Sequence, residues 1–125
     1  MQTDMTALTF DRSRESWSKS TGFVKERVRI PHLTEEDRDM ALIRVHMAGF
    51  CGSDRGIWWR KAFGDRIETS LDEESRNKRI IGHEFLGQVM GIGGDVTRVR
   101  IGDMVAAESH IVCQTCLQCL NDELH

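Results

Sequence analysis

Several features that mark other classes of protein are missing from this sequence. The N-terminus carries Asp4 and no basic segment followed by an apolar one, so it does not resemble a signal peptide. No run of apolar residues approaches the roughly 20 needed to cross a bilayer. The formal net charge is −3, without the basic stripe that nucleic acid or an anionic membrane requires. We therefore expect a cytoplasmic protein that binds small molecules or proteins, but neither nucleic acid nor membranes.

Internal repeats and low-complexity tracts are also absent. A length of 125 residues can hold one hydrophobic core but leaves no room for a second full domain. In a chain without an export signal, four cysteines indicate metal binding or catalytic thiols before disulfides. The sequence thus predicts one domain, residues 1–125, with a metal-binding function.

Alternation of apolar and polar residues predicts a mainly β fold. In the stretch 23–30, Val24 and Val28 share one face while Lys25 and Arg27 occupy the other, as a half-buried strand requires. Trp17 is expected to begin a further strand. The stretches that show strand character are 6–10, 23–30, 40–48, 80–92 and 104–108. Together they predict a compact, barrel-like domain with little helix.

The segment 58–79 is highly charged, yet Trp59, Phe63, Ile67 and Leu71 recur every four residues along it. This spacing lines one face of a helix. One interpretation is an inserted segment that packs against the rest of the domain through its apolar stripe. The other is that Trp58 and Trp59 form the wall of a substrate cleft.

The run Gly91-Ile92-Gly93-Gly94 superficially resembles a dinucleotide-binding fingerprint. Its third glycine falls at the wrong spacing, and the residues that follow, 95–99, do not begin a helix. We predict a turn here and no nucleotide site.

Cys113, Cys116 and Cys119 form the strongest local signal. Gaps of two residues allow successive thiolates to converge on one tetrahedral ion, with bonds of about 2.3 Å. The sequence predicts structural zinc, against the alternatives of free thiols or a disulfide. A structural site needs four ligands, so either His125 or a ligand from outside would complete it, or the site is weakened.

A second group of candidate ligands is dispersed along the chain. Cys51 and His83 are 32 positions apart, too far for spacing alone to pair them. The surrounding motifs, Cys-Gly-Ser-Asp at 51–54, Gly-His-Glu at 82–84, Gly-Asp-x-Val at 102–105 and the thiol cluster, occur in an order that resembles the medium-chain zinc-dependent alcohol dehydrogenases. The resemblance is to their N-terminal GroES-like catalytic domain. The stretch 107–113 is most similar to the threonine and polyol or sugar dehydrogenase branch.

This resemblance implies a role for each matching residue. Cys51 and His83 would be ligands of a catalytic zinc, and Glu84 an exchangeable or outer ligand beside them. Asp54 would orient the imidazole of His83, since a carboxylate on the far ring nitrogen selects the tautomer. Ser53 would receive the proton of the substrate alcohol. The implied cofactors are catalytic and structural zinc, with NAD or NADP as hydride acceptor in a full-length protein.

The sequence also departs from the family pattern. Gly56 stands where many relatives have a proton-relaying histidine, so the relay would end at Ser53 or use water. The family's fourth structural cysteine, its remaining catalytic ligand and its Rossmann domain have no counterpart in these 125 residues.

We therefore expect the N-terminal catalytic domain of a dehydrogenase acting on an alcohol, a polyol or a 2-amino-3-hydroxy acid. Alone it is expected to be inactive, and a homo-oligomer is one option for its assembly. The competing hypothesis is a non-enzymatic zinc-binding module, or an inactive remnant of a dehydrogenase.

Overall fold

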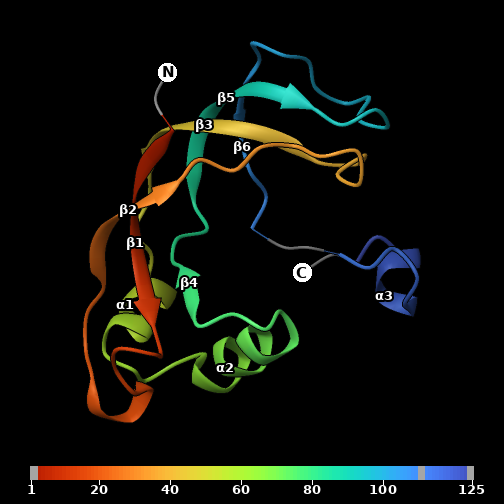
Figure 1. The fold of residues 1–125 in the computed structure, drawn as a ribbon. Coiled ribbons are helices and arrows are strands. Elements are labelled where there is room, and N and C mark those ends of the chain that lie inside the picture. The colour runs from red at the N-terminus through yellow and green to blue at the C-terminus, as the bar shows by residue number, and fades with distance from the viewer. Residues whose placement is uncertain (1–2, 110–111, 124–125) are drawn as a thin grey trace.

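The computed structural model describes residues 3–109 and 112–123. These residues form two antiparallel sheets with short helices, and α3 lies apart from both sheets (Figure 1). One sheet has the strand order β2-β1-β4 and the other β3-β5-β6. The elements are β1 (Asp4–Asp11), η1 (Trp17–Lys19), β2 (Val24–Arg29), β3 (Ala41–Ala48), α1 (Gly52–Trp58), α2 (Gly64–Glu73), β4 (Lys78–Ile80), β5 (Phe85–Ile92), β6 (Met104–Ala106) and α3 (Leu117–Leu120).

The mainly β fold with short helices confirms the prediction from sequence. The strands in the described residues form two separate sheets, however, and do not close into one hydrogen-bonded barrel. The predicted strand at Trp17 is wrong, because Trp17 begins the 3-10 helix η1. Its indole packs edge-on against Phe10, with ring centroids 5.2 Å apart. A single aromatic residue can cover a core from a helical turn as well as from a strand.

The core lies between the first sheet and α2. Phe10 of β1 and Leu71 of α2 are fully buried, and Ile67 lies one helical turn before Leu71 on the same face. Trp17 and Ile57 pack around them. Burying a side chain of this size contributes roughly 1.5–3 kcal/mol, so these few residues supply much of the attraction between α2 and the sheet.

The two halves of the apolar stripe in segment 58–79 differ: the residues within α2 are buried, and those before it are exposed. Ile67 and Leu71 dock the helix on the sheet, which confirms the docking interpretation for this half. Trp59 and Phe63 precede the helix and remain 51% and 48% exposed. The four-residue spacing is therefore helical only from Gly64 onward.

Each of the three α-helices in the described part of the chain is followed by a non-glycine residue in the left-handed conformation. These residues are Arg60, Ser75 and Asp122, with φ of 56°, 51° and 58°. After α1, the N–H of Lys61 donates to the carbonyl of Gly56 at 2.8 Å. This hydrogen bond, from the sixth residue of the turn to the first, is typical of a Schellman motif. The same pattern of backbone hydrogen bonds closes α2 and α3. The chain consequently reverses direction sharply after every helix.

The second sheet is less covered than the first. The first half of β3 is half-buried, whereas its residues from 44 onward are exposed, including Val45 at 54% and Met47 at 67%. Compact monomers of 14.3 kDa expose about 6,800 Å², while this chain exposes 9,804 Å². Several large apolar side chains of β3, β5 and β6 are exposed, among them Leu86 and Met104.

The predicted turn at Gly91–Gly94 begins only in the second half of the run, because Gly91 and Ile92 are the last residues of β5. β5 ends at Ile92, and the N–H of Gly93 donates to the carbonyl of Met40 at 2.8 Å. No helix follows within the described residues up to 109.

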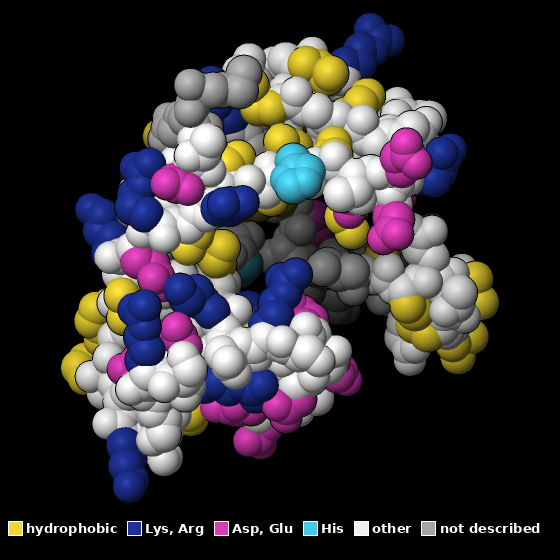
Figure 2. Space-filling view, viewed as in Figure 1, with side chains coloured by type: hydrophobic (Ala, Val, Ile, Leu, Met, Phe, Trp, Pro, Cys, Tyr) yellow, Lys and Arg dark blue, Asp and Glu magenta, His cyan; other side chains and the backbone are white. Residues whose placement is uncertain are grey.

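Basic and acidic side chains are interspersed on the face drawn in Figure 2. None of the helices in the described part of the chain combines the length and apolar character that crossing a bilayer requires.

Candidate metal centres

The Cys-Gly-Ser-Asp motif forms the start of α1. Cys51 is the N-cap, and its Sγ accepts the N–H of Ser53 at 3.3 Å. Asp54 reaches back, and its Oδ2 accepts the N–H of Cys51 at 3.0 Å. This reciprocal arrangement is a capping box with a thiol in place of the usual hydroxyl. The spacing of Cys51 and Asp54 therefore has a structural cause as well as a chemical one.

His83 comes to this helix end from the connection between β4 and β5. Gly82 turns the chain with φ of 126°, a conformation that side chains rarely permit. The Nε2 of His83 then lies 3.1 Å from Cys51 Sγ and 3.3 Å from Ser53 Oγ. Ser53 Oγ is 2.7 Å from the same sulfur. Three groups separated in sequence thus converge on one point.

Asp54 lies behind the imidazole and is only 2% exposed. Its Oδ1 is 3.4 Å from His83 Nδ1, and this buried oxygen has no hydrogen-bond partner among the residues that the structure describes. A buried carboxylate oxygen without a partner is costly. A proton on Nδ1 would satisfy it and leave Nε2 free as a metal ligand.

A zinc ion fits the Cys51–His83 pair. Bonds of about 2.3 Å to sulfur and about 2.0 Å to nitrogen place two tetrahedral ligands about 3.5 Å apart, near the observed 3.1 Å. A thiolate with an imidazole is also the donor set that zinc prefers over calcium or magnesium.

Glu84 lies at the edge of this group and is half exposed. Its Oε1 is 3.9 Å from His83 Nε2, beyond hydrogen-bond distance but next to the proposed metal position. Gly49 faces it directly: the N–H of Gly49 donates to the Glu84 carbonyl at 2.9 Å, and a Cβ on Gly49 would overlap the Glu84 carboxylate. Nothing in the sequence indicated that Gly49 makes room for the side chain of Glu84.

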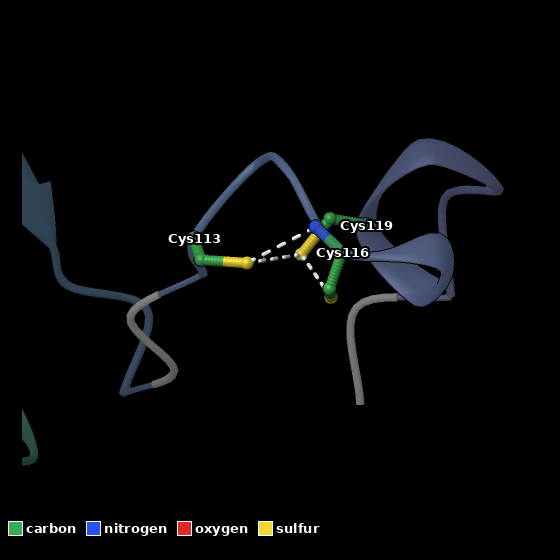
Figure 3. Close-up of side chains that lie close together, drawn as sticks. All are labelled: Cys113, Cys116 and Cys119. Atoms are coloured by element: carbon green, nitrogen blue, oxygen red, sulfur yellow. Dashed lines mark hydrogen bonds between the residues drawn. The ribbon is translucent and has the colours of Figure 1, made fainter.

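The thiol cluster forms a second candidate centre, with Cys113 and Cys116 on the loop that leads into α3 and Cys119 in α3 itself (Figure 3). Cys119 Sγ lies 3.4 Å from Cys116 Sγ and 3.7 Å from Cys113 Sγ. Tetrahedral zinc with bonds of about 2.3 Å places its sulfur ligands about 3.8 Å apart, so the three thiols fit one ion. His125, considered as the fourth ligand, lies outside the described residues.

Local hydrogen bonds shift the thiol pKa values in opposite directions. The hydroxyl and N–H of Thr115, followed by Cys116, lower the pKa of Cys113 to about 6. Hydrogen bonding to Cys116 raises the pKa of Cys119. A lowered thiol pKa favours metal binding, since the thiolate is the form that binds an ion.

An aromatic group borders the first centre and was not predicted. Phe23 contacts both Trp58 and Phe50 edge-on, with centroid distances of 5.3 and 6.4 Å. Phe50 directly precedes Cys51 and is 61% exposed. These residues share no sequence spacing, so only the fold could show that they meet. Trp59 instead lines a separate cleft on α1.

Comparison with known proteins agrees with this arrangement. Residues 37–125, which contain every residue of both centres, match the family model described as "Alcohol dehydrogenase GroES-like domain". The chain belongs to this family. It is 38% identical over 105 residues to the L-threonine 3-dehydrogenase of Bacillus subtilis (strain 168), a match that spans 83% of this chain and 27% of that protein.

Other relatives point the same way. The L-threonine 3-dehydrogenase of Caldanaerobacter subterraneus subsp. tengcongensis is 39% identical over 88 residues, which make up 70% of this chain and 23% of that enzyme. The structure of alcohol dehydrogenase TADH from Thermus sp. ATN1 is 28% identical, with a TM-score of 0.66 over 96% of this chain and 29% of that one. This chain thus spans about a quarter of the length of these relatives.

Proposed function

We propose that this chain is the catalytic domain of a zinc- and nicotinamide-dependent dehydrogenase that oxidises an alcohol, a polyol or a 2-amino-3-hydroxy acid. The observation that carries the proposal is the convergence of Cys51 Sγ, Ser53 Oγ and His83 Nε2, with separations of 2.7 to 3.3 Å. Its similarity to L-threonine 3-dehydrogenases supports the substrate class.

In this proposal Cys51 and His83 hold the catalytic ion, and Glu84 is close enough to exchange onto it. Bound zinc would supply a Lewis acid that polarises the substrate oxygen. Asp54 keeps the proton of His83 on Nδ1, so that Nε2 points its lone pair at the metal position. The second centre, at Cys113, Cys116 and Cys119, would bind a structural zinc that folds the loop before α3.

Ser53 is positioned to handle the proton of the substrate hydroxyl. Its Oγ lies within 3.3 Å of both metal-binding atoms, so a substrate oxygen bound there would be within hydrogen-bond reach of it. Gly56, one helical turn after Gly52 on α1, has no side chain to pass the proton onward. The proton would therefore leave from Ser53 to water.

The alternative of a non-enzymatic zinc module accounts for the thiol cluster but not for Ser53. A structural site needs four protein ligands that saturate the ion. At the first centre a non-ligating hydroxyl instead lies beside the two best ligands, which favours an open, catalytic position.

We also propose that a polypeptide of these 125 residues alone oxidises no alcohol. Hydride transfer requires the nicotinamide to be held against the substrate. The one Gly-x-Gly run, at 91–93, lies at the end of β5, leads into a turn and does not begin a helix.

A chimera tests the function directly. The 125 residues would replace the matching N-terminal part of the Bacillus subtilis L-threonine 3-dehydrogenase, and reduction of NAD or NADP would be followed with threonine, sorbitol and simple alcohols. We expect activity with at least one substrate in the chimera, none in a Cys51→Ser chimera and none in the 125-residue chain. A chimera that folds and binds zinc yet oxidises none of them would refute the proposal. Turnover by the 125-residue chain above a Cys51→Ala control would refute its inactivity alone.

A further inference from the structure

A cleft on the exposed side of α1 contains two cations that the proposed chemistry does not use. Its volume is about 480 Å³, and it is lined by Gly52, Arg55, Gly56, Trp59 and Lys61. This volume lies in the range of small-molecule sites. No acidic residue is among the five, so the lining carries two positive charges and one aromatic ring.

The backbone brings the two cations together. Arg55 lies in the middle of α1, while Lys61 follows the helix by three residues. The reversal at Arg60 folds the chain back, and the N–H of Lys61 donates to the carbonyl of Gly56, the neighbour of Arg55. The backbone hydrogen bonds that end α1 therefore place both cations on the lining of the cleft.

Neither cation is neutralised. In the part of the chain that the structure describes, no carboxylate lies within ion-pair distance of Arg55 or Lys61. Arg60, which lies between them in the sequence, differs from both: its side chain is 4% exposed, and its guanidinium pairs with Glu15 at 3.3 Å. Two unpaired cations facing one cleft attract an anion more strongly than either would alone.

The cleft also adjoins the first metal centre. Gly52 directly follows Cys51, and a Cβ at Gly52 would meet no atom within 4 Å, so the space beside it is open. Gly56 differs, because a Cβ there would lie 2.8 Å from that of Ala62, so the open space beside the Cys51–His83 centre is at Gly52.

We propose that Arg55 and Lys61 bind a phosphate group, with Trp59 as the apolar wall of the site. A phosphate monoester carries close to two negative charges at neutral pH, which match the two cations, and Arg forms paired hydrogen bonds to its oxygens. The phosphate could belong to a phosphorylated substrate or to the phosphates of a dinucleotide. The choice between these sources rests on the proposed dehydrogenase function, whereas phosphate binding itself does not.

Binding is tested on the 125-residue chain at low ionic strength by calorimetry and by NMR of the Trp59 indole N–H. Inorganic phosphate, glycerol 3-phosphate, NAD and NADP are titrated separately. The Arg55→Ala/Lys61→Ala variant should bind phosphate at least about tenfold more weakly, equivalent to about 1.4 kcal/mol. Lys25→Ala, which removes one charge from the exposed face of β2, should change the dissociation constant less than twofold.

The probes assign the source of the phosphate. Tighter binding of glycerol 3-phosphate than of either dinucleotide indicates a substrate phosphate, and the reverse order indicates the cofactor. No titration with any of the four probes, or equal affinity in wild type and the double variant, overturns the proposal. A Cys51→Ser variant should retain wild-type phosphate affinity, so failure of the metal centre and failure of this cleft are distinguishable.

Discussion

Asp54 and His83 face each other behind the candidate catalytic centre, with Oδ1 of the carboxylate 3.4 Å from Nδ1 of the ring. The other carboxylate oxygen of Asp54 caps α1 through the N–H of Cys51. One side chain thus positions both candidate ligands, Cys51 through the helix end and His83 through its ring. This double role places one buried acid in contact with both candidate ligands.

Replacing Asp54 tests this relationship. Asp54→Asn should weaken zinc at the Cys51–His83 centre about 10- to 100-fold, because the ring loses the partner that selects its tautomer. Zinc affinity is measured by competition with a chelator, in a Cys116→Ser background that removes the second centre. Asp65→Asn, which changes an exposed acid in the first turn of α2, is the matched control. Equal zinc affinity in wild type and Asp54→Asn would contradict the role given to Asp54.

The thiol cluster should hold its own ion. Cys116→Ser is expected to contain one zinc per chain fewer than wild type by elemental analysis, because two thiols bind too weakly to retain the ion. Cys51→Ser should lose the other ion and keep this one. Zinc at both centres should dissociate as the pH falls, since protons compete for the ligands. Identical zinc content in wild type and Cys116→Ser would show that the cluster binds none.

Arg60 offers a test of backbone strain. Its left-handed conformation costs roughly 1 kcal/mol, while its guanidinium packs over the rings of Phe10 and Trp17 at 4.8 and 5.0 Å. Arg60→Ala should lower the free energy of unfolding by about 2 kcal/mol or more, because the contacts are lost and the strain remains. Arg60→Gly should be about 1 kcal/mol more stable than Arg60→Ala, since glycine relieves the strain.

Ser75 provides the control for this comparison. It is also left-handed, but its side chain is exposed, so Ser75→Gly should stabilise the fold slightly relative to wild type. Urea denaturation measures all four proteins. If Arg60→Ala is as stable as wild type, the guanidinium contacts contribute nothing to the fold.

Acid should destabilise the fold by protonating two carboxylates of the β2-β1-β4 sheet, Asp11 and Glu26. Hydrogen bonds from Ser13, followed by the charge of Lys78, lower the pKa of Asp11. The Thr9 hydroxyl and then Lys78 lower that of Glu26. Because both folded-state pKa values lie below their ordinary values of 3.8 and 4.5, the stabilisation is complete at neutral pH. It is lost as the pH falls below about 4.5 toward the folded values.

Denaturation at several pH values between 3 and 7 measures this loss. The unfolding free energy should be flat from pH 5.5 to 7 and then decline. In Asp11→Asn the decline should be shallower, because one of the titrating groups is gone. Parallel curves for wild type and Asp11→Asn would exclude Asp11 as a source of acid sensitivity.

Features that depend on nearby residues could be predicted from the sequence. The alternation of apolar and charged residues around Val24 and Val28 indicated β2. The spacing of Cys113, Cys116 and Cys119 indicated that one loop binds a single metal ion. In both cases the backbone period alone places the side chains together. The strand predicted at Trp17 was wrong because a single aromatic residue shows no apolar–polar alternation. The helical stripe predicted for 58–79 was wrong in its first half, because the chain reverses direction at Arg60 and α2 begins only at Gly64.

Only the tertiary structure brings together the candidate ligands Cys51 and His83 and the two cations of the cleft on α1. The motifs around Cys51 and His83 suggested ligands, but only the reversal at Gly82 brings the imidazole to within 3.1 Å of the sulfur. Likewise, Arg55 and Lys61 are ordinary charged residues in the sequence, and the backbone hydrogen bonds that end α1 place them in one cleft. Local spacing determines contacts within a few residues, whereas contacts between distant residues arise when burial of Phe10, Ile67 and Leu71 folds the chain onto itself.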